Sequence, residues 1–82
     1  MSVYILFPTL MQAQRGRKLL SDNGVPAQVV KAPRQMGEKG CAYAVRMSDR
    51  WLERSLGALD DGTIRYGRIF VPEGDGFREV RT

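Results

Sequence analysis

Apolar residues along the chain recur with two different periods, and the two periods alternate. Residues 3–7 are an unbroken apolar run, mostly β-branched or aromatic, which is typical of a central strand covered on both faces. Residues 25–31, 41–47 and 63–71 predict three further strands, and residues 77–80 predict a short terminal strand after a turn. Pro26 has no amide donor, so the second strand should lie at an edge of the sheet or pair only beyond that residue.

Helical spacing between the first two strands predicts an amphipathic helix over about residues 10–22. Thr9 is a favourable N-cap, and Gln12, three residues further on, fits a capping box. Gly16 is a poor helix former, but on the inner face it would permit close packing against a sheet. Asn23-Gly24 supplies the left-handed residue that ends such a helix. The expected apolar positions are Leu10, Met11, Ala13, Leu19 and Leu20, and the expected water-facing ones are Arg15, Arg17 and Lys18.

A second helix is predicted after the third strand. Ser48 is placed to cap it, and Asp49 suits its first turn. Its end is marked by the sequence Asp60-Asp61-Gly62. Its apolar face should consist of Trp51, Leu52, Leu56 and Leu59.

This order of elements, β-α-β-β-α-β, predicts an α+β fold. Two helices on one face of an antiparallel sheet bury these apolar stripes economically, which gives a ferredoxin-like two-layer sandwich with a short extra C-terminal strand. Residues 1–82 are expected to form one domain. The other face of the sheet should be only partly covered, and in so small a domain an open apolar face favours a homodimer.

Composition removes several classes of function. The chain has one cysteine and no histidine, so it can form no internal disulfide and no zinc site of the usual Cys/His spacing. No apolar run is long enough to span a membrane, and the apolar start stops at Pro8 without a basic region before it, so we expect a strand and no signal peptide. These features predict a cytoplasmic protein with no cofactor and no membrane contact.

Positive charge is concentrated in one part of the chain. The net charge is +4, and the segment from Arg15 to Arg46 holds seven basic and two acidic residues. Such a run is often only a solvated helix face and a loop. The functional alternative is a surface that attracts an anion, an acidic protein or nucleic acid.

Cys41 is the one candidate for reactive chemistry. It stands where a glycine-containing loop meets a strand, with Lys39 and Arg34 in the same loop. Nearby cations favour the reactive thiolate, and Gly40 would leave room for a partner's sulfur atom to approach. The alternative is a buried structural cysteine, because strand alternation places Cys41 on the same face as Tyr43, Val45 and Met47.

The segments 25–34 and 41–46 resemble a family of small bacterial domains, the putative Se/S carrier protein-like family. The matching features are the opening strand, the helix that closes at Asn23-Gly24, the Pro33-Arg34 pair and the cysteine at the head of the next strand. Two features depart from the family's pattern: residues 35–40 replace a Ser-rich loop, and Ala42 stands where a glycine follows the cysteine. The resemblance implies that Cys41 carries sulfur or selenium as a persulfide or selenopersulfide, with Arg34 as the cation that stabilises it.

Three functions therefore stay open: a carrier, a binding or regulatory module, and a plain structural or accessory subunit in which Cys41 is buried. A carrier would work with protein partners that load and unload it, as an accessory protein more than a self-sufficient enzyme. A binding or regulatory module would present the basic surface to nucleic acid or to an acidic protein and would use Cys41 structurally. Nucleic acid is the weaker alternative, because Tyr66-Gly-Arg-Ile-Phe70 is only a faint echo of an RNA-recognition motif.

Overall fold

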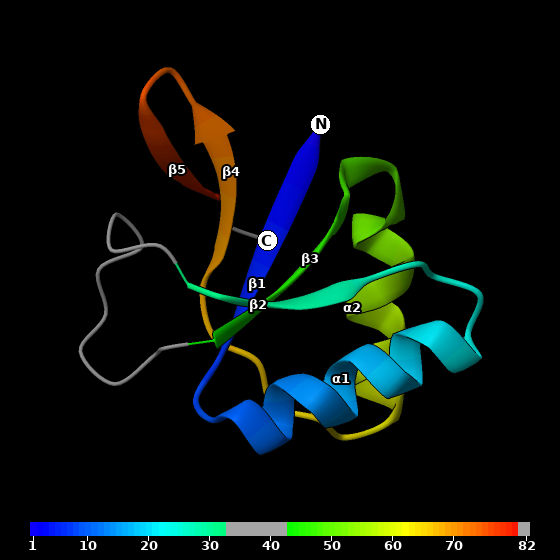
Figure 1. Ribbon diagram of the computed structural model, residues 1–82. Coiled ribbons are helices and arrows are strands. Elements are labelled where there is room, and N and C mark those ends of the chain that lie inside the picture. Colours follow the sequence, from blue (N-terminus) through cyan, green and yellow to red (C-terminus); the bar gives the residue numbers. More distant parts are fainter. Residues whose placement is uncertain (33–42, 81–82) are drawn as a thin grey trace.

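The computed structural model describes residues 1–32 and 43–80 of the chain. Within these residues one sheet runs in the order β2-β3-β1-β4-β5, and every neighbouring pair of strands is antiparallel. Two α-helices, α1 (Leu10–Asp22) and α2 (Leu52–Asp61), pack beside it (Figure 1). The strands are β1 (Ser2–Phe7), β2 (Gln28–Lys31), β3 (Tyr43–Ser48), β4 (Ile69–Glu73) and β5 (Gly76–Val80).

The order of the strands confirms the predicted fold class. The four strands β2-β3-β1-β4, with a helix after β1 and another after β3, form the split βαβ arrangement of a ferredoxin-like α+β fold. The predicted extra C-terminal strand is also present, as β5, which pairs with β4 at one end of the sheet.

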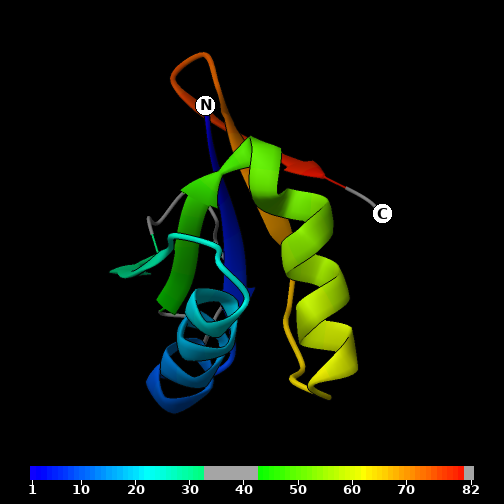
Figure 2. The ribbon, with the colours of Figure 1, turned by 90° about the vertical axis from the view of Figure 1, so that its right-hand side faces the viewer.

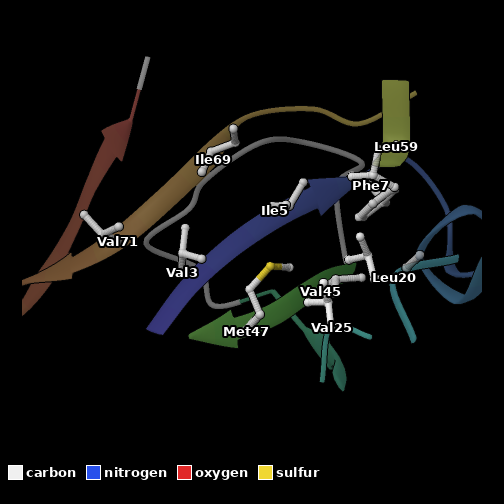
Figure 3. Close-up of a cluster of buried hydrophobic side chains, with 11 residues drawn as sticks. Val3, Ile5, Phe7, Leu20, Val25, Val45, Met47, Leu59, Ile69 and Val71 are labelled. Carbon is white, nitrogen blue, oxygen red and sulfur yellow. The ribbon is translucent and has the colours of Figure 1, made fainter. Parts of the chain in front are cut away.

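Both helices lie on the same face of the sheet. Figure 2 shows α1 and α2 beside each other, and the core joins Leu20 of α1 and Leu59 of α2 to the alternate β1 residues Val3, Ile5 and Phe7. These side chains point into one cluster between the layers (Figure 3). All five are fully buried, which is what makes the unbroken apolar run of the first strand favourable in this position.

The opposite face of the sheet carries a second, smaller apolar cluster. Leu6, Ala44 and Phe70 form it, with exposed fractions of 1%, 0% and 5%. Tyr4 and Phe77 pack against this cluster and are half-buried. This face is therefore partly covered, as the sequence predicts.

The boundaries of α1 follow from local chemistry. The side chain of Thr9 accepts a hydrogen bond of 3.1 Å from the backbone N–H of Gln12, and Gly24 adopts the left-handed conformation, with φ of 79°, just after the helix. Gly16 faces the sheet, where a Cβ atom would lie 2.7 Å from Cζ of Phe7. The predicted close packing through Gly16 is confirmed.

One part of the predicted α1 face is wrong. Leu10 and Met11 are 40% and 68% exposed, whereas Ala13 and Leu20 are fully buried. The buried stripe of α1 therefore begins at Ala13 and leaves the first two residues of the helix exposed.

The second and fourth strands are shorter than predicted. β2 begins at Gln28 rather than residue 25, because the backbone N–H of Val25 bonds to the carbonyl of Leu20 and Pro26 has no donor. β4 begins at Ile69 rather than residue 63, because Ile64 donates its backbone N–H to Leu59 at the end of α2.

The start of the second helical segment also differs from the prediction. Ser48 makes no side-chain cap hydrogen bond, and residues Asp49–Trp51 form a turn of 3-10 helix, η2, before α2 begins. The rest of the prediction is confirmed: Leu59 is fully buried, Gly62 is the C-cap, and Trp51, Leu52 and Leu56 pack against the main core.

Candidate functional site

The four residues that the sequence selects for chemistry, Cys41, Arg34, Lys39 and Gly40, lie outside the described residues. Their predicted roles stay predictions. What the structure does define is the pair of residues at which the described chain stops and resumes, Ala32 and Tyr43.

These two flanks lie at one end of the sheet. Lys31, which precedes Ala32, pairs with Tyr43 across β2 and β3, and Tyr43 pairs in turn with Phe7, the last residue of β1. The chain therefore leaves β2 and enters β3 at the end where β1 leads into α1. The exposed side chains at this end include the cation Lys31 on β2 and the apolar Leu10 and Met11 at the start of α1.

The face of β3 that Cys41 would share by alternation is the helix-covered one. Val45 and Met47 belong to the main core, with exposed fractions of 0% and 4%, and Tyr43 packs against it. The prediction for these three residues is confirmed, whereas Cys41 itself lies outside the described residues.

The opposite face of the sheet has an ordered row of side chains. The register places one residue from each strand in line across it, and the row is Gln28, Arg46, Tyr4, Phe70 and Glu79. Its polar members are already engaged: Arg46 donates to Oε1 of Gln28 at 2.8 Å, and Arg68 donates to Oε1 of Glu79 at 2.7 Å. Arg68 also lies over the ring of Phe70, 5.2 Å from its centroid.

This row bears on the nucleic-acid alternative. A stacking surface needs aromatic rings that are exposed and on one face. Phe70 is 5% exposed and belongs to the smaller cluster, whereas Tyr66 packs against the main core on the helix side. Tyr4 meets Phe77 edge to face, with ring centroids 5.5 Å apart. Residues 66 and 70 therefore form no common platform.

Electrostatics single out one tyrosine. The pKa of Tyr66 is raised above its usual value, first by burial and then by the nearby carboxylate of Asp60, to which the side chain is also hydrogen-bonded. Both the partial burial and the negative charge disfavour the phenolate. The folded protein therefore favours the neutral phenol of Tyr66.

Two structural features, a cluster of metal ligands and a membrane-spanning helix, are absent from the described part of the chain. Residues 1–32 and 43–80 contain no group of three or more acidic or cysteine side chains that could hold a metal ion. No helix in these residues has the length and apolar character needed to cross a membrane.

Comparison with known proteins identifies the family. Residues 2–71 match the family described as "Putative Se/S carrier protein-like". The chain belongs to this family. The matched residues run from β1 into β4 and include Cys41, whereas β5 lies beyond them. No curated protein and no solved structure matches the chain.

One surface of the molecule does not follow from the sequence pattern. A hollow lies between α1 and β2, with the exposed Met11 and several α1 cations along it. The sequence predicts its two sides separately: a helix with basic residues, and a strand that lies at an edge of the sheet because of Pro26. Only the packing of α1 beside β2 brings them together.

Proposed function

We propose that this protein carries sulfur or selenium on the thiol of Cys41 and passes it between partner enzymes. The observation that supports this is the family match over residues 2–71, a range that contains the chain's only cysteine. With no histidine in the chain, Cys41 is also the side chain best suited to act as a nucleophile.

The proposed loading step is a simple sulfur exchange. The thiolate of Cys41 attacks the outer sulfur of a persulfide on a donor enzyme, R–S–SH. A new S–S bond forms on Cys41, the donor's S–S bond breaks, and the donor leaves as a thiolate, R–S⁻. No net oxidant or reductant is consumed, because one persulfide replaces another. Selenium would follow the same path from R–S–SeH, which would leave a selenopersulfide on Cys41.

The neighbours of Cys41 in the sequence have roles in this proposal. Arg34 and Lys39 would stabilise the thiolate by direct attraction, which lowers the pKa of the thiol. Gly40 would leave the sulfur atom accessible to the donor. A reducing cytoplasm would keep the thiol free between cycles, and the domain of residues 1–82 would act through protein partners or as a homodimer.

Intact-mass spectrometry tests the loading step. The folded protein is incubated with a cysteine desulfurase and cysteine, and the expected result is a species heavier by one sulfur atom that a reducing thiol removes. Cys41→Ser should acquire no such adduct. A wild-type protein that stays unmodified, or a Cys41→Ser variant that gains the same mass, would overturn the proposal.

Thiol labelling separates the carrier from a structural cysteine. We expect Cys41 in the folded protein to react with iodoacetamide at neutral pH, and Arg34→Ala to react more slowly because its thiol pKa is higher. Arg50→Ala is the matched control, since Arg50 lies over Trp51 on the second helical segment. Protection of Cys41 until the protein is denatured would support the structural alternative instead.

A further inference from the structure

The feature that carries a further inference is the hollow between α1 and β2, which we call the α1–β2 groove. It is a shallow hollow, open to solvent, with a volume of about 820 Å³. One wall is a single face of α1, formed by positions 11, 14, 15 and 18, each of which lies three or four residues from two of the others. Val29, a half-buried residue of β2 that packs against the main core, contributes to the other side.

The groove is cationic along α1. Arg15, Arg17 and Lys18 line it, all three are exposed, and none of the described residues that line it is acidic. Among the described residues, no carboxylate lies within ion-pair distance of these three cations. Two arginines of the second helical segment differ: Arg50 and Arg54 lie over the ring of Trp51, at 5.2 and 5.6 Å. Within residues 1–32 and 43–80 the α1 cations have no acidic partner, so they can meet a negatively charged one.

The groove also has an apolar part. Met11 is 68% exposed and lines it together with Ala27 and Val29. An exposed methionine beside half-buried aliphatic residues can pack against a partner's side chain with little reorganisation. The groove can therefore accept an apolar side chain between acidic ones.

Beside the groove runs an edge of the sheet. β2 is the terminal strand of the sheet order, and among the described residues its one strand partner is β3. The outer edge of such a strand presents backbone N–H and C=O groups that an extended chain can pair with. Alternate side chains of an added strand would then point to the helix side of the sheet, which is where the groove lies.

We propose that the α1–β2 groove binds an extended, acidic segment of a partner protein by strand addition to β2. The backbone of the segment pairs with the outer edge of Gln28–Lys31. Its alternate side chains enter the groove, where carboxylates meet Arg15, Arg17 and Lys18 and an apolar residue packs against Met11. This recognition does not depend on Cys41 and goes beyond the carrier function.

Charge and composition distinguish this occupant from two others. A second copy paired through β2 about a two-fold axis would bring its own Arg15, Arg17 and Lys18 toward the same cations, which is unfavourable. Single-stranded nucleic acid would need aromatic rings to stack its bases. None of the described residues that line the groove is aromatic. An acidic peptide satisfies the charge, the apolar part and the strand edge together.

The test uses a synthetic peptide whose alternate residues are glutamate, leucine, glutamate and glutamate, with threonine between them. Binding to the full-length protein is measured by fluorescence anisotropy and by NMR shifts of backbone amides. We expect shifts in Gln28–Lys31 and in α1, and a loss of affinity when glutamine replaces glutamate. A peptide with methylated backbone nitrogens, which cannot pair with a strand, should also bind more weakly.

Matched charge reversals on the two helices decide whether the groove is the site. We expect the double variant Arg15→Glu/Lys18→Glu to bind at least about tenfold more weakly, and Arg50→Glu/Arg54→Glu to bind as the wild type does. Met11→Ser should weaken binding, and Cys41→Ser should leave it unchanged. Circular dichroism of each variant checks that the fold is kept.

Four results would overturn this proposal. The first two are equal loss of affinity in the two double variants and equal binding of the glutamate and glutamine peptides. The third is a set of amide shifts confined to β4 and β5. The fourth is tighter binding of an oligothymidylate than of the peptide at the same salt concentration. A homodimer in sedimentation that the Arg15→Glu/Lys18→Glu change abolishes would assign the groove to a second copy instead. Loss of sulfur loading in Cys41→Ser with peptide binding intact would separate this site from the carrier function.

Discussion

The helices α1 and α2 cover the same face of the sheet, but they meet it in different ways. α1 approaches so closely at Gly16 that even a Cβ atom would press on the ring of Phe7, and its outer side presents cations. α2 presents Gly57 to open space, and Arg54 lies over Trp51. The difference indicates that α1 combines tight packing inside with an available charged surface outside, whereas α2 mainly closes the core.

The same substitution should have opposite effects on the two helices. In Gly16→Ala the added Cβ would lie 2.7 Å from Cζ of the fully buried Phe7, so we expect a net loss of about 1–2 kcal/mol in unfolding free energy. In Gly57→Ala nothing lies within 4 Å of the new atom, and the better helix former should add about 0.5–1 kcal/mol. Urea denaturation measures both.

A second variant checks the cause of the Gly16 effect. Phe7→Leu removes the ring that the new Cβ would meet, so Gly16→Ala should cost less in that background than in the wild type. Equal costs in both backgrounds would contradict the close-packing account of α1.

The core under α2 contains a buried polar contact between Ser55 and Met47. Breaking this contact should give the next largest change in unfolding free energy. The hydroxyl of Ser55 is fully buried and donates to Sδ of Met47 at 2.9 Å. Met47→Leu keeps the volume but removes the acceptor, so we expect a loss of about 1.5 kcal/mol. In a Ser55→Ala background the same change should cost less, because no buried hydroxyl is left without its partner. Thermal unfolding of the wild type, the two single variants and the double variant measures the interaction energy between Ser55 and Met47.

The helix starts provide a smaller contrast. Thr9 accepts a hydrogen bond from the backbone of Gln12, whereas Ser48 makes no side-chain cap bond at the 3-10 turn before α2. Thr9→Ala should lower the unfolding free energy by about 1 kcal/mol. Ser48→Ala should change it by less than about 0.5 kcal/mol. Equal losses would mean that Ser48 caps its segment in solution.

The smallest expected effect is electrostatic and lies at the C-terminal end of α2. Burial and the Asp60 carboxylate raise the pKa of Tyr66, so the folded state favours the neutral phenol. The stability that this provides is complete below the unfolded pKa, near 10, and is lost as the pH rises through the folded value. Asp60→Asn should lower the pKa of Tyr66 toward its usual value.

An ultraviolet titration measures this shift, with Tyr66→Phe identifying the contribution of Tyr66 among the three tyrosines. An unchanged titration in Asp60→Asn would show that burial alone raises the pKa of Tyr66.

Much of the fold could be predicted because local signals and burial agree. The Thr9 cap, the left-handed Gly24 and the inner position of Gly16 all follow from residue chemistry, and the structure confirms them. The shortened β4 could not be predicted, because apolar residues such as Ile64 and Tyr66 fit a strand pattern. In the structure these two side chains pack against the core from an irregular segment.

The candidate functional residues also include some features that the sequence predicts and others that only the tertiary structure defines. The sequence by itself determined that Cys41 is the chain's only thiol, that histidine chemistry is absent and that positive charge gathers between Arg15 and Arg46. These are properties of composition and need no coordinates. Tertiary structure decided which of those charges share a surface, because the packing of α1 beside β2 sets Arg15 and Lys18 next to a strand edge. Neighbours across a helix and a strand are fixed by burial of their inner faces, which no local pattern specifies.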